Sequence, residues 1–410
     1  MHIVLLTHHY VPETGAPQRR WSAFVQRFMD AGHRVTVLTP PPHYPAGRLD
    51  TAHDGVRPGT VSRGAYGETV VRVRFREHDH SLLSRTSDQL VAASDSVRHA
   101  LSLLSGSQDR PDVVVATAPG LPSIPAGMLL GRLLRRPAVV EMRDAWPDLI
   151  ASSGMWGPGQ GRGLRARATT VTHESLTLLQ RRAAAVVTTT VSFADVLSAR
   201  GVPRVAVVRN GAHVPDLPLL PPPGRGPGEL RVLYLGTMGR SQGLETAVQA
   251  ADLVRRRGVQ MRLRLVGSGA DVDHLSALAR ELDAPVDVLA RVPADEVLTH
   301  YAWADTTLVS LRDWGPFEWT IPSKMYELFA VGRHVSASLA GEAARVVEES
   351  GAGDVVVPQS PLALADLWCA LAAERARLDV GRAGRLWVEQ NADHDRLATA
   401  YLELLAQVRT

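Results

Sequence analysis

The sequence predicts an α/β protein built from two doubly wound domains, each with a parallel sheet covered by helices on both faces. Short runs rich in β-branched residues alternate with longer amphipathic stretches along the whole chain, which is typical of β-α-β units. The 410 residues exceed the size at which one hydrophobic core usually stops growing. A segment rich in proline and glycine, PDLPLLPPPGRGPG at residues 215–228, divides the chain near its middle.

The first half of the chain is expected to form one domain, residues 1–210. It begins with HIVLLT, an apolar run with no basic flank and too short for a signal peptide, which predicts a first strand. The expected strands are residues 2–7, 34–39, 69–75, 112–116, 138–141, 185–188 and 205–208. The expected helices are residues 17–31, 83–104, 121–134, 170–182 and 192–199.

After a linker at residues 211–229, the second domain is expected over residues 230–389. Its expected strands are residues 231–235, 262–266, 285–289, 306–310, 334–337 and 354–357, and its expected helices are residues 244–257, 271–282, 294–301, 322–330, 342–350 and 361–373. A last helix, about residues 390–410, is expected to pack back on the first domain. Because ligands bind at the carboxyl ends of parallel strands, we expect two domains that face each other across a cleft.

Composition narrows the classes of protein. With 45% hydrophobic and 21% charged residues, the chain is predicted to be folded, and its single cysteine, Cys369, excludes an internal disulfide and suits the cytoplasm. No apolar run reaches the length of a transmembrane helix. Residues 1–200 carry 23 arginines against 16 acidic side chains, which favours contact with anionic lipid or a phosphorylated substrate, or simply a solvated surface. Nucleic acid is not expected, because aromatics are only 5% and are not interleaved with basic runs.

One residue stands out in this arginine-rich chain: Lys324 is the only lysine. It lies in IPSKMYE, where proline suits the first position of a helix and Ser323 precedes the lysine. A cation in the first helical turn costs about 0.3–1 kcal/mol, and a bound phosphate would reverse that sign. Glu327, one turn on, can accept hydrogen bonds from sugar hydroxyls. The alternative is an exposed Lys324–Glu327 ion pair.

Three glycine-containing turns follow predicted strands. Gly15 lies in HHYVPETGAPQRR, Gly236 opens GTMGRSQG and Gly267 lies in VGSG. Glycine lets a backbone approach a ligand, and the helix that follows offers free N–H groups to a phosphate, although each turn is also compatible with a plain connection. The spacing after Gly236 is not the dinucleotide fingerprint, which argues against a nicotinamide enzyme.

Charged residues also end a buried-looking strand in EMRDAWPD, where Arg143 and Asp144 can orient a hydroxyl or meet a pyrophosphate, or can form a structural ion pair. His8 and His9 are adjacent, so we expect them to point in different directions and not to form a metal site. The HDH run at residues 78–80 has no third ligand nearby in sequence and is interpreted as a solvated loop. No Asp-x-Asp metal motif occurs.

Taken in order, these motifs resemble those of the retaining GT-B glycosyltransferases of family 4, in particular the branch that transfers amino-sugars in bacterial surface polysaccharide pathways. The matching segments are PETGAPQRR, AGHRVTVLT, PPHYP, EMRDAWPD, RNGA, YLGTMGRSQGLE, LVGSG, IPSKMYELFAVGRHV and GEAARVVEESGAGDVVV. The resemblance spans nearly the whole chain. It implies the GT-B fold, with the nucleotide-sugar mainly on the second domain and the acceptor on the first.

The resemblance also implies roles for particular residues. Asp144 would lie near the reacting centre, with Lys324 beside the diphosphate. The other implied substrate-binding residues are Gly15, Arg143, Asn210, Gly236, Thr237, Gln242, Gly267, Ser323, Glu327, Gly341 and Glu342.

Two departures from the family pattern concern charged residues: two cations are absent, and the spacing of two glutamates differs. Thr237 and Gln242 are uncharged where the wider family has an arginine and a lysine, so Lys324 is the natural replacement. The family also spaces two glutamates eight residues apart, whereas Glu318 and Glu327 are nine apart. The group that contacts the sugar is therefore not assigned.

The resemblance implies a retaining glycosyltransferase without a cofactor, and the lack of an Asp-x-Asp motif favours a metal-independent one. It is expected to move an N-acetylhexosamine-type sugar from a UDP-sugar to a hydroxyl of a glycan, a lipid-linked sugar or a natural product, in the cytoplasm or at the inner face of the membrane. The leaving diphosphate would take the acceptor proton, so no protein nucleophile is needed. The alternatives are a GT-B-fold UDP-sugar epimerase and a noncatalytic nucleotide-sugar-binding partner.

Overall fold

The computed structural model describes residues 1–13, 15–44, 46–50, 56–79, 81–104, 106, 110–146, 148–149, 162–224, 226 and 228–409. The chain divides into two compact units. The first unit is made of Met1–Asn210 together with His394–Thr410, and the second is Gly211–Asp393. Each unit is built around its own sheet.

The first unit contains an eight-stranded sheet in the order β3-β4-β2-β1-β5-β6-β7-β8. Its strands are β1 (His2–Leu6), β2 (Arg34–Thr39), β3 (Val61–Arg63), β4 (Thr69–Arg72), β5 (Val113–Thr117), β6 (Ala138–Met142), β7 (Ala185–Thr188) and β8 (Val205–Val207). All neighbouring strands are parallel except β3, which pairs antiparallel with β4 at the edge. The central strands are buried on both faces, which explains their continuous apolar sequences.

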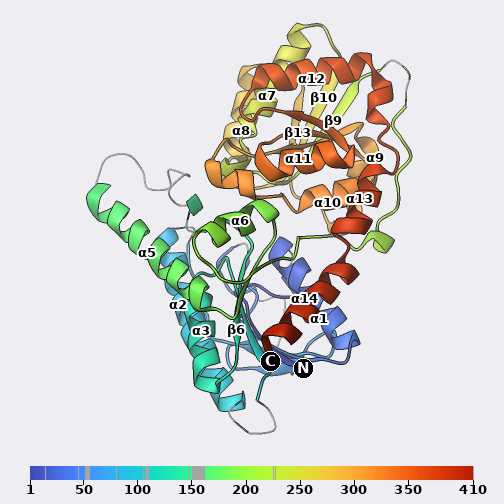
Figure 1. Ribbon diagram of the computed structural model, residues 1–410. Helices are drawn as coiled ribbons and strands as arrows, with labels where there is room; N and C mark the ends of the chain where they lie inside the picture. The colour runs from blue at the N-terminus through green and yellow to red at the C-terminus, as the bar shows by residue number, and fades with distance from the viewer. Residues whose placement is uncertain are drawn as a thin grey trace. The chain divides into compact units, whose positions relative to one another are not determined.

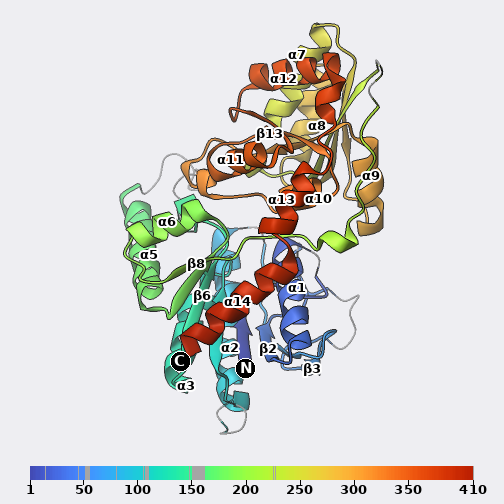
Figure 2. The same cartoon turned by 45° about the vertical axis from the view of Figure 1, so that its right-hand side comes forward.

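Helices cover both faces of this sheet (Figure 1). They are α1 (Ala16–Asp30), α2 (Leu82–Leu104), α3 (Ser123–Leu134), α5 (Arg162–Arg182), α6 (Val191–Ala199) and α14 (His394–Arg409). In Figure 1, α1 and α14 lie on one side of the strands and α2 and α3 lie on the other, in agreement with two separate core clusters; Figure 2 shows a turned view with α14 in front. The C-terminal helix is held through Tyr401, whose ring packs against Trp21, Phe24 and Phe28 of α1 at 5.7–6.0 Å.

The second unit contains a six-stranded parallel sheet in the order β11-β10-β9-β12-β13-β14. Its strands are β9 (Leu230–Thr237), β10 (Met261–Ser268), β11 (Val286–Leu289), β12 (Thr306–Ser310), β13 (His334–Ser338) and β14 (Gly353–Val356). Its α-helices are α7 (Glu245–Arg256), α8 (Val272–Glu281), α9 (Val297–Trp303), α10 (Lys324–Ala330), α11 (Gly341–Ser350), α12 (Pro361–Ala373) and α13 (Ala383–Asn391). Short 3₁₀ helices cover Val214–Asp216, Arg240–Gln242, Ala294–Glu296, Gly315–Trp319 and Arg375–Leu378.

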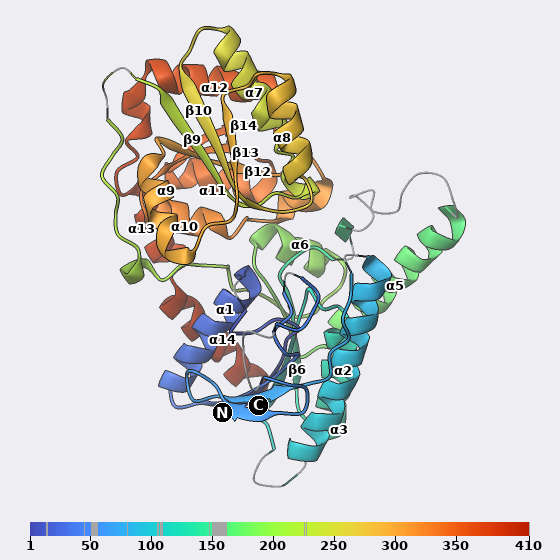
Figure 3. The ribbon, with the colours of Figure 1, turned by 180° about the vertical axis from the view of Figure 1, so that it is seen from behind.

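Two core clusters again lie on opposite faces of the sheet. One contains residues of α7, α8 and α12, and the other contains residues of α9, α10, α11 and α13; Figure 3 shows the second unit from behind with these labels. Part of the expected linker at residues 211–229 packs against the second unit. Leu217 and Leu220 pack against the second cluster, and Arg385 of α13 donates hydrogen bonds to the carbonyls of Val214 and Leu217.

The expected α/β fold with two parallel, helix-covered sheets is what the structure shows. Strands β2, β7 and β12 and helix α12 have the expected bounds. The edge strand β3 was not expected, because all three of its residues are exposed and it has no apolar run. Helix α5 begins eight residues earlier than expected, within an arginine-rich stretch that lacks a hydrophobic repeat. In the described part of the chain, none of the helices combines the length and the apolar character that crossing a bilayer requires.

Candidate functional site

The carboxyl edge of the first sheet carries a buried ion pair at the end of β6. Glu141 is inaccessible to solvent, and its Oε2 accepts from Nη2 of Arg20 at 3.0 Å, while its Oε1 accepts from Thr117 Oγ1 at 3.1 Å. Arg20 comes from α1 and also donates to the carbonyl of Val208 and, at 3.5 Å, to Oδ1 of Asn210. The expected site residue Asn210 is thus tied to α1 and β6 through one arginine.

Two residues further on, Arg143 and Asp144 differ in their surroundings. Arg143 is buried, donates from Nε to the carbonyl of Ala118 at 3.1 Å, and accepts at its own carbonyl from Thr189. Asp144 is half-buried, and no described residue donates a hydrogen bond to its carboxylate. Burial raises the pKa of Asp144, and the positive charge of Arg143 opposes that rise. A carboxyl with a raised pKa and no structural partner is a candidate for proton transfer or substrate binding.

Asp148, four residues after Asp144, has a structural role instead. Both of its carboxylate oxygens accept from Arg200 of α6, at 2.7 and 3.1 Å, and His173 of α5 lies 3.3 Å away. The two aspartates of EMRDAWPD are therefore distinguished by their partners, which the sequence motif does not reveal.

Gly15 lies at the start of α1 with an extended backbone, φ −174°, and its carbonyl accepts from the N–H of Arg19. Next to it, Gln18 is buried and donates from Nε2 to Glu13 at 2.8 Å. Its Oε1 is buried without a hydrogen-bond partner in the described structure. Sequence analysis missed Gln18, although its place in the first turn of a helix that opens at a strand's end is the usual signal for a ligand contact.

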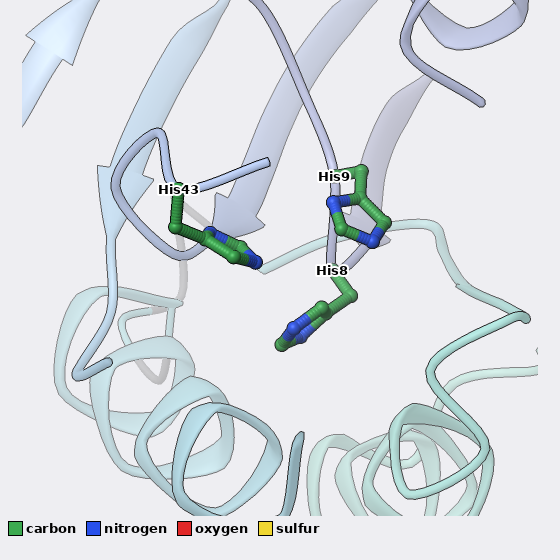
Figure 4. A group of neighbouring side chains, drawn as sticks. All are labelled: His8, His9 and His43. Atoms are coloured by element: carbon green, nitrogen blue, oxygen red, sulfur yellow. The ribbon is translucent and has the colours of Figure 1, made fainter. Parts of the chain in front are cut away.

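Three histidines gather at the same edge, contrary to the expectation that His8 and His9 point apart. Figure 4 shows His8 and His9, which follow β1, beside His43 from the loop after β2. Their ring centroids are separated by 5.0–5.2 Å. The expectation was wrong because β1 ends at Leu6, so strand alternation no longer applies. His43 was missed because it is distant in sequence, although β1 and β2 pair in parallel and end at one edge.

The interpretation of His78 as solvated was wrong as well. Its Nε2 lies 3.9 Å from Asp88, which is fully buried, and its ring packs against His43 at 5.8 Å between centroids. The neighbouring Asp79 is exposed, and His80 lies outside the described residues. No further ligand group was expected near His78, but Asp88 of α2 and His43 both lie close to it.

Burial and hydrogen bonding set the charges of this cluster. Burial lowers the pKa of His8, His9 and His43, against the opposing effect of neighbouring carboxylates. For Glu13, burial acts to raise the pKa, but the hydrogen bond from His9 and the positive charge of the histidines bring the pKa to about 2. For Asp88, burial also acts to raise the pKa, but the contact with His8, the hydrogen bond from the N–H of Arg76 and the nearby histidines together lower it. A lowered pKa favours the neutral form of each ring and the ionised form of each carboxyl.

In the second unit, two of the expected site glycines lie side by side. Gly236 and Gly267 are paired residues at the carboxyl ends of β9 and β10. Gly267 has φ 154°, a region that favours glycine, and a Cβ there would lie 1.8 Å from the carbonyl oxygen of Gly236. This close approach of two backbones lies at the edge where parallel sheets bind ligands.

The turn after Gly236 is held by its own side chains. Oε1 of Gln242 accepts from the N–H of Gly239 at 3.1 Å, and Ser310 at the end of β12 donates to the carbonyl of Gln242 at 2.7 Å. Thr237 is exposed. Arg312 donates to the carbonyl of Arg240 and pairs with Glu245. Gln242 therefore shapes the turn, and Arg312, which sequence analysis did not single out, supplies a cation beside it.

Lys324 is the first residue of α10, and Ser323 precedes it. Nζ of Lys324 lies 3.3 Å from Oε2 of Glu327, and the same oxygen accepts from Tyr301 Oη at 3.3 Å. The side chains of Lys324 and Glu327 are 24% and 20% exposed, so both remain accessible to a ligand. The ion pair weighed as the alternative from sequence is formed.

Gly341 has φ 66°, and a Cβ there would lie 2.1 Å from the carbonyl oxygen of Glu318. This close approach places the 3₁₀ helix Gly315–Trp319 against the start of α11. Glu342 is buried in the first turn of α11, where a negative charge interacts favourably with the helix dipole. Glu318 itself is exposed.

Comparison with known families gives matches to both halves of the chain. Residues 15–211 match the family described as glycosyl transferase 4-like domain, and residues 229–374 match the family described as glycosyl transferases group 1. A colanic acid biosynthesis glycosyl transferase of Escherichia coli K12, WcaI, is 25% identical over 81% of this chain and 82% of its own. A GDP-mannose-dependent α-(1-6)-phosphatidylinositol monomannoside mannosyltransferase of Mycobacterium tuberculosis is 30% identical over 42% of this chain and 46% of its own.

Solved structures agree on the fold. Sucrose-phosphate synthase of Thermosynechococcus elongatus superposes with a TM-score of 0.76 at 17% identity, over 99% of this chain and 98% of its own. HepE of Anabaena, solved with UDP-glucose, has a TM-score of 0.68 at 15% identity, over 99% and 100% of the two chains. With family matches in both halves and this fold, the chain belongs to the GT-B glycosyltransferases.

Proposed function

We propose that this glycosyltransferase moves an N-acetylhexosamine-type sugar from a UDP-sugar to a hydroxyl acceptor, with retention at the anomeric carbon and without a metal ion or other cofactor in the transfer step. The donor binds the second unit and the acceptor binds the first. The observation that carries the proposal is the pairing of Gly236 with Gly267 at the carboxyl ends of β9 and β10, the edge of a parallel sheet at which ligands bind.

The chemistry follows from the charges at each edge. In the second unit, Lys324 offers a compact cation at the start of a helix, and a leaving diphosphate beside it is stabilised as its charge develops. In the first unit, Asp144 has a raised pKa and can bind and orient the acceptor hydroxyl. The acceptor proton passes to the leaving diphosphate, so the transfer needs no protein nucleophile.

The UDP preference draws on the HepE complex with UDP-glucose, whereas the mycobacterial relative is named for GDP-mannose. A thermal-shift panel of UDP-, GDP- and dTDP-sugars therefore tests the donor directly. We expect UDP-N-acetylhexosamines to raise Tm most, because at one ligand concentration a ligand of lower Kd stabilises the folded state more. Equal shifts for all three nucleotides would refute the UDP preference, and a larger shift with GDP-mannose would replace it.

We also propose that the first unit contacts an anionic membrane at the inner face of the cell, where a lipid-linked acceptor would lie. The supporting surface lies on α2, α3 and α5, which expose Leu83, Leu90, Leu129, Leu133, Val171 and Leu178. Arginines accompany these side chains, among them Arg132 at the end of α3 and Arg181 and Arg182 at the end of α5. Exposed apolar side chains together with arginines on the same helices suit the surface of an anionic bilayer.

Vesicle sedimentation tests this contact. We expect the protein to pellet with vesicles that contain phosphatidylglycerol and not with pure phosphatidylcholine, and we expect Leu129→Ser together with Leu133→Ser to reduce pelleting at least about fivefold. Leu362, equally exposed in the second unit, provides the matched control as Leu362→Ser. Binding to neither kind of vesicle would refute the membrane proposal and leave the transferase proposal standing.

Two other activities remain to be separated by experiment. A UDP-sugar epimerase would isomerise its substrate without an acceptor, so incubation with the UDP-sugar alone distinguishes it from a transferase. A noncatalytic binding partner would bind UDP but turn over no donor. In that case Asp144→Asn would leave its cellular role intact.

A further inference from the structure

We propose that His8, His9 and His43 form a binding site for one divalent transition-metal ion, best suited to Zn²⁺. One ring nitrogen of each histidine lies within 4.8 Å of one ring nitrogen of each of the others. Three points this close share a centre no more than about 2.8 Å away. Each nitrogen therefore needs to move by less than about 1 Å to reach the Zn–N distance of about 2.1 Å.

The hydrogen bonds of the three rings prepare them for metal binding. Nε2 of His8 lies 2.9 Å from a carboxylate oxygen of Asp88, Nδ1 of His9 donates to Glu13 at 3.2 Å, and Nδ1 of His43 donates to the carbonyl of Pro41 at 2.8 Å. A neutral imidazole that donates from one nitrogen keeps a lone pair on the other. Partners of this kind, a carboxylate or a backbone carbonyl behind each ring, accompany histidines that bind zinc.

One ring nitrogen of the cluster, Nε2 of His43, has no hydrogen-bond partner among the described residues. This nitrogen is buried, and the His43 side chain is 2% exposed. Figure 4 shows this ring reaching from its own loop toward His8 and His9. A buried imidazole nitrogen without a partner carries a cost that a bound ion removes.

Charge and access also fit a cation. The carboxylates of Glu13 and Asp88, directly behind the rings, balance the two positive charges of the ion. The positive charge of Arg143 acts on His9 and opposes a cation there, but the Arg143 side chain donates its hydrogen bond to the Ala118 carbonyl. His9 is less buried than the other two rings and provides the route of entry. The three rings leave a fourth coordination position for water or a ligand.

The ion takes no part in the transfer step proposed above. It would link the segment after β1 to the loop after β2, and so fix the chain just before Gly15 and α1. Zinc binding is measured without donor or acceptor, so its failure does not affect the proposed glycosyl transfer.

The test uses the full-length protein after chelation and dialysis. Titration with ZnCl₂ should give one tight site per chain, and His9→Ala and His43→Ala should each weaken it at least 100-fold. His274→Ala, which removes an exposed histidine from α8, is the matched control and should bind as the wild type does. His9→Ala is the more informative variant if His43→Ala does not fold, because His9 is less buried than His43.

X-ray absorption of the zinc complex adds a readout of the ligands. We expect nitrogen and oxygen neighbours at about 2.0–2.1 Å with imidazole scattering and no sulfur. No zinc uptake by the wild type would overturn the proposal and identify the cluster as a network of hydrogen-bonded neutral histidines. Wild-type affinity in both variants, or a sulfur ligand from Cys369, would overturn it as well.

Discussion

At the scale of single residues, Asp144 and Asp148 separate a proposed functional role from a structural one within one motif. Asp144→Asn keeps the shape of the side chain and removes its charge, so we expect donor binding to persist and the transfer rate to fall about 10²-fold, because the acceptor hydroxyl is no longer oriented. Initial rates with saturating donor measure this. Asp148→Asn is the control, because it removes the charge and one of the two bonds to Arg200 and should lower Tm more than the rate. Equal losses of rate in the two variants would contradict the assignment.

Lys324 is predicted to recognise the diphosphate even though it pairs with Glu327. Lys324→Ala should weaken binding of the nucleoside diphosphate at least about tenfold and leave nucleoside binding nearly unchanged. Lys324→Arg should fold normally and lose transfer activity, because the broad guanidinium does not replace a compact ammonium at a helix start. Calorimetric titration with UDP and uridine checks the first expectation. Equal weakening of both ligands would rule out a phosphate contact.

Gly267 is predicted to be irreplaceable. In Gly267→Ala the new Cβ would meet the carbonyl of Gly236 at 1.8 Å, in addition to the unfavourable φ of 154°, so we expect a loss of about 3 kcal/mol or more. Gly258→Ala is the matched control, because its φ of 78° is also unfavourable but open space surrounds it; about 1 kcal/mol is expected there. Urea denaturation compares the two. Equal stability of the two variants would show that the backbone of β10 shifts enough to relieve the clash.

At the scale of elements, β13 and β14 are joined by a charge-dependent contact. Oδ2 of Asp354 accepts from His334 Nε2 at 2.9 Å, and Oδ1 accepts from Arg377 at 2.7 Å. These bonds, the one from His334 first, lower the pKa of Asp354 in the folded state. A depressed carboxyl pKa stabilises the fold above the unfolded-state value of about 3.9, and this contribution is lost as the pH falls through the folded-state value.

Asp354→Asn is therefore expected to be about 1 kcal/mol less stable than the wild type at pH 7, because one hydrogen-bonded charge is lost at a partly exposed site. The gap should close as the pH falls from 5 towards 3. Asp366→Asn, at an exposed pair with Arg257, should change stability by less than about 0.5 kcal/mol. Urea unfolding at several pH values measures both. A gap that is independent of pH would contradict the role of the Asp354 charge.

Also at this scale, the elements that could be predicted from sequence are those with a strong apolar pattern. β12 and α12 have such patterns and were located correctly, whereas β3 consists of three exposed residues that are held by pairing with β4 alone. The candidate site divides in the same way. The glycine turns were visible as local motifs, while the histidine cluster depends on which strands become neighbours, and local spacing does not contain that information.

At the scale of the whole molecule, the first unit is discontinuous in sequence, and this makes α14 essential to it. Leu397, Tyr401, Leu404 and Leu405 are buried, and each such side chain contributes about 1.5–3 kcal/mol. The sum is comparable to the whole stability of a typical domain. Deleting residues 394–410 should therefore unfold the first unit and spare the second.

Hydrogen exchange distinguishes the two units in the truncated protein. Amides of β1 and α1 should lose protection, and those of β9 and β10 should keep it. A shorter deletion, residues 407–410, removes only the end of α14 beyond the four buried side chains and should preserve protection in both units. Loss of protection in β9 and β10 to the same extent as in β1 would contradict the independence of the second unit.

Because α14 belongs to the first unit, it also affects how the protein folds during its synthesis. Synthesis proceeds from the N-terminus, and domains generally fold as units while the chain is still being made. The whole second unit is translated before α14. Until α14 is complete, the face of α1 that contains Trp21 and Phe24 therefore lacks the helix that covers it. The half of the molecule that is made first is therefore the last to be completed.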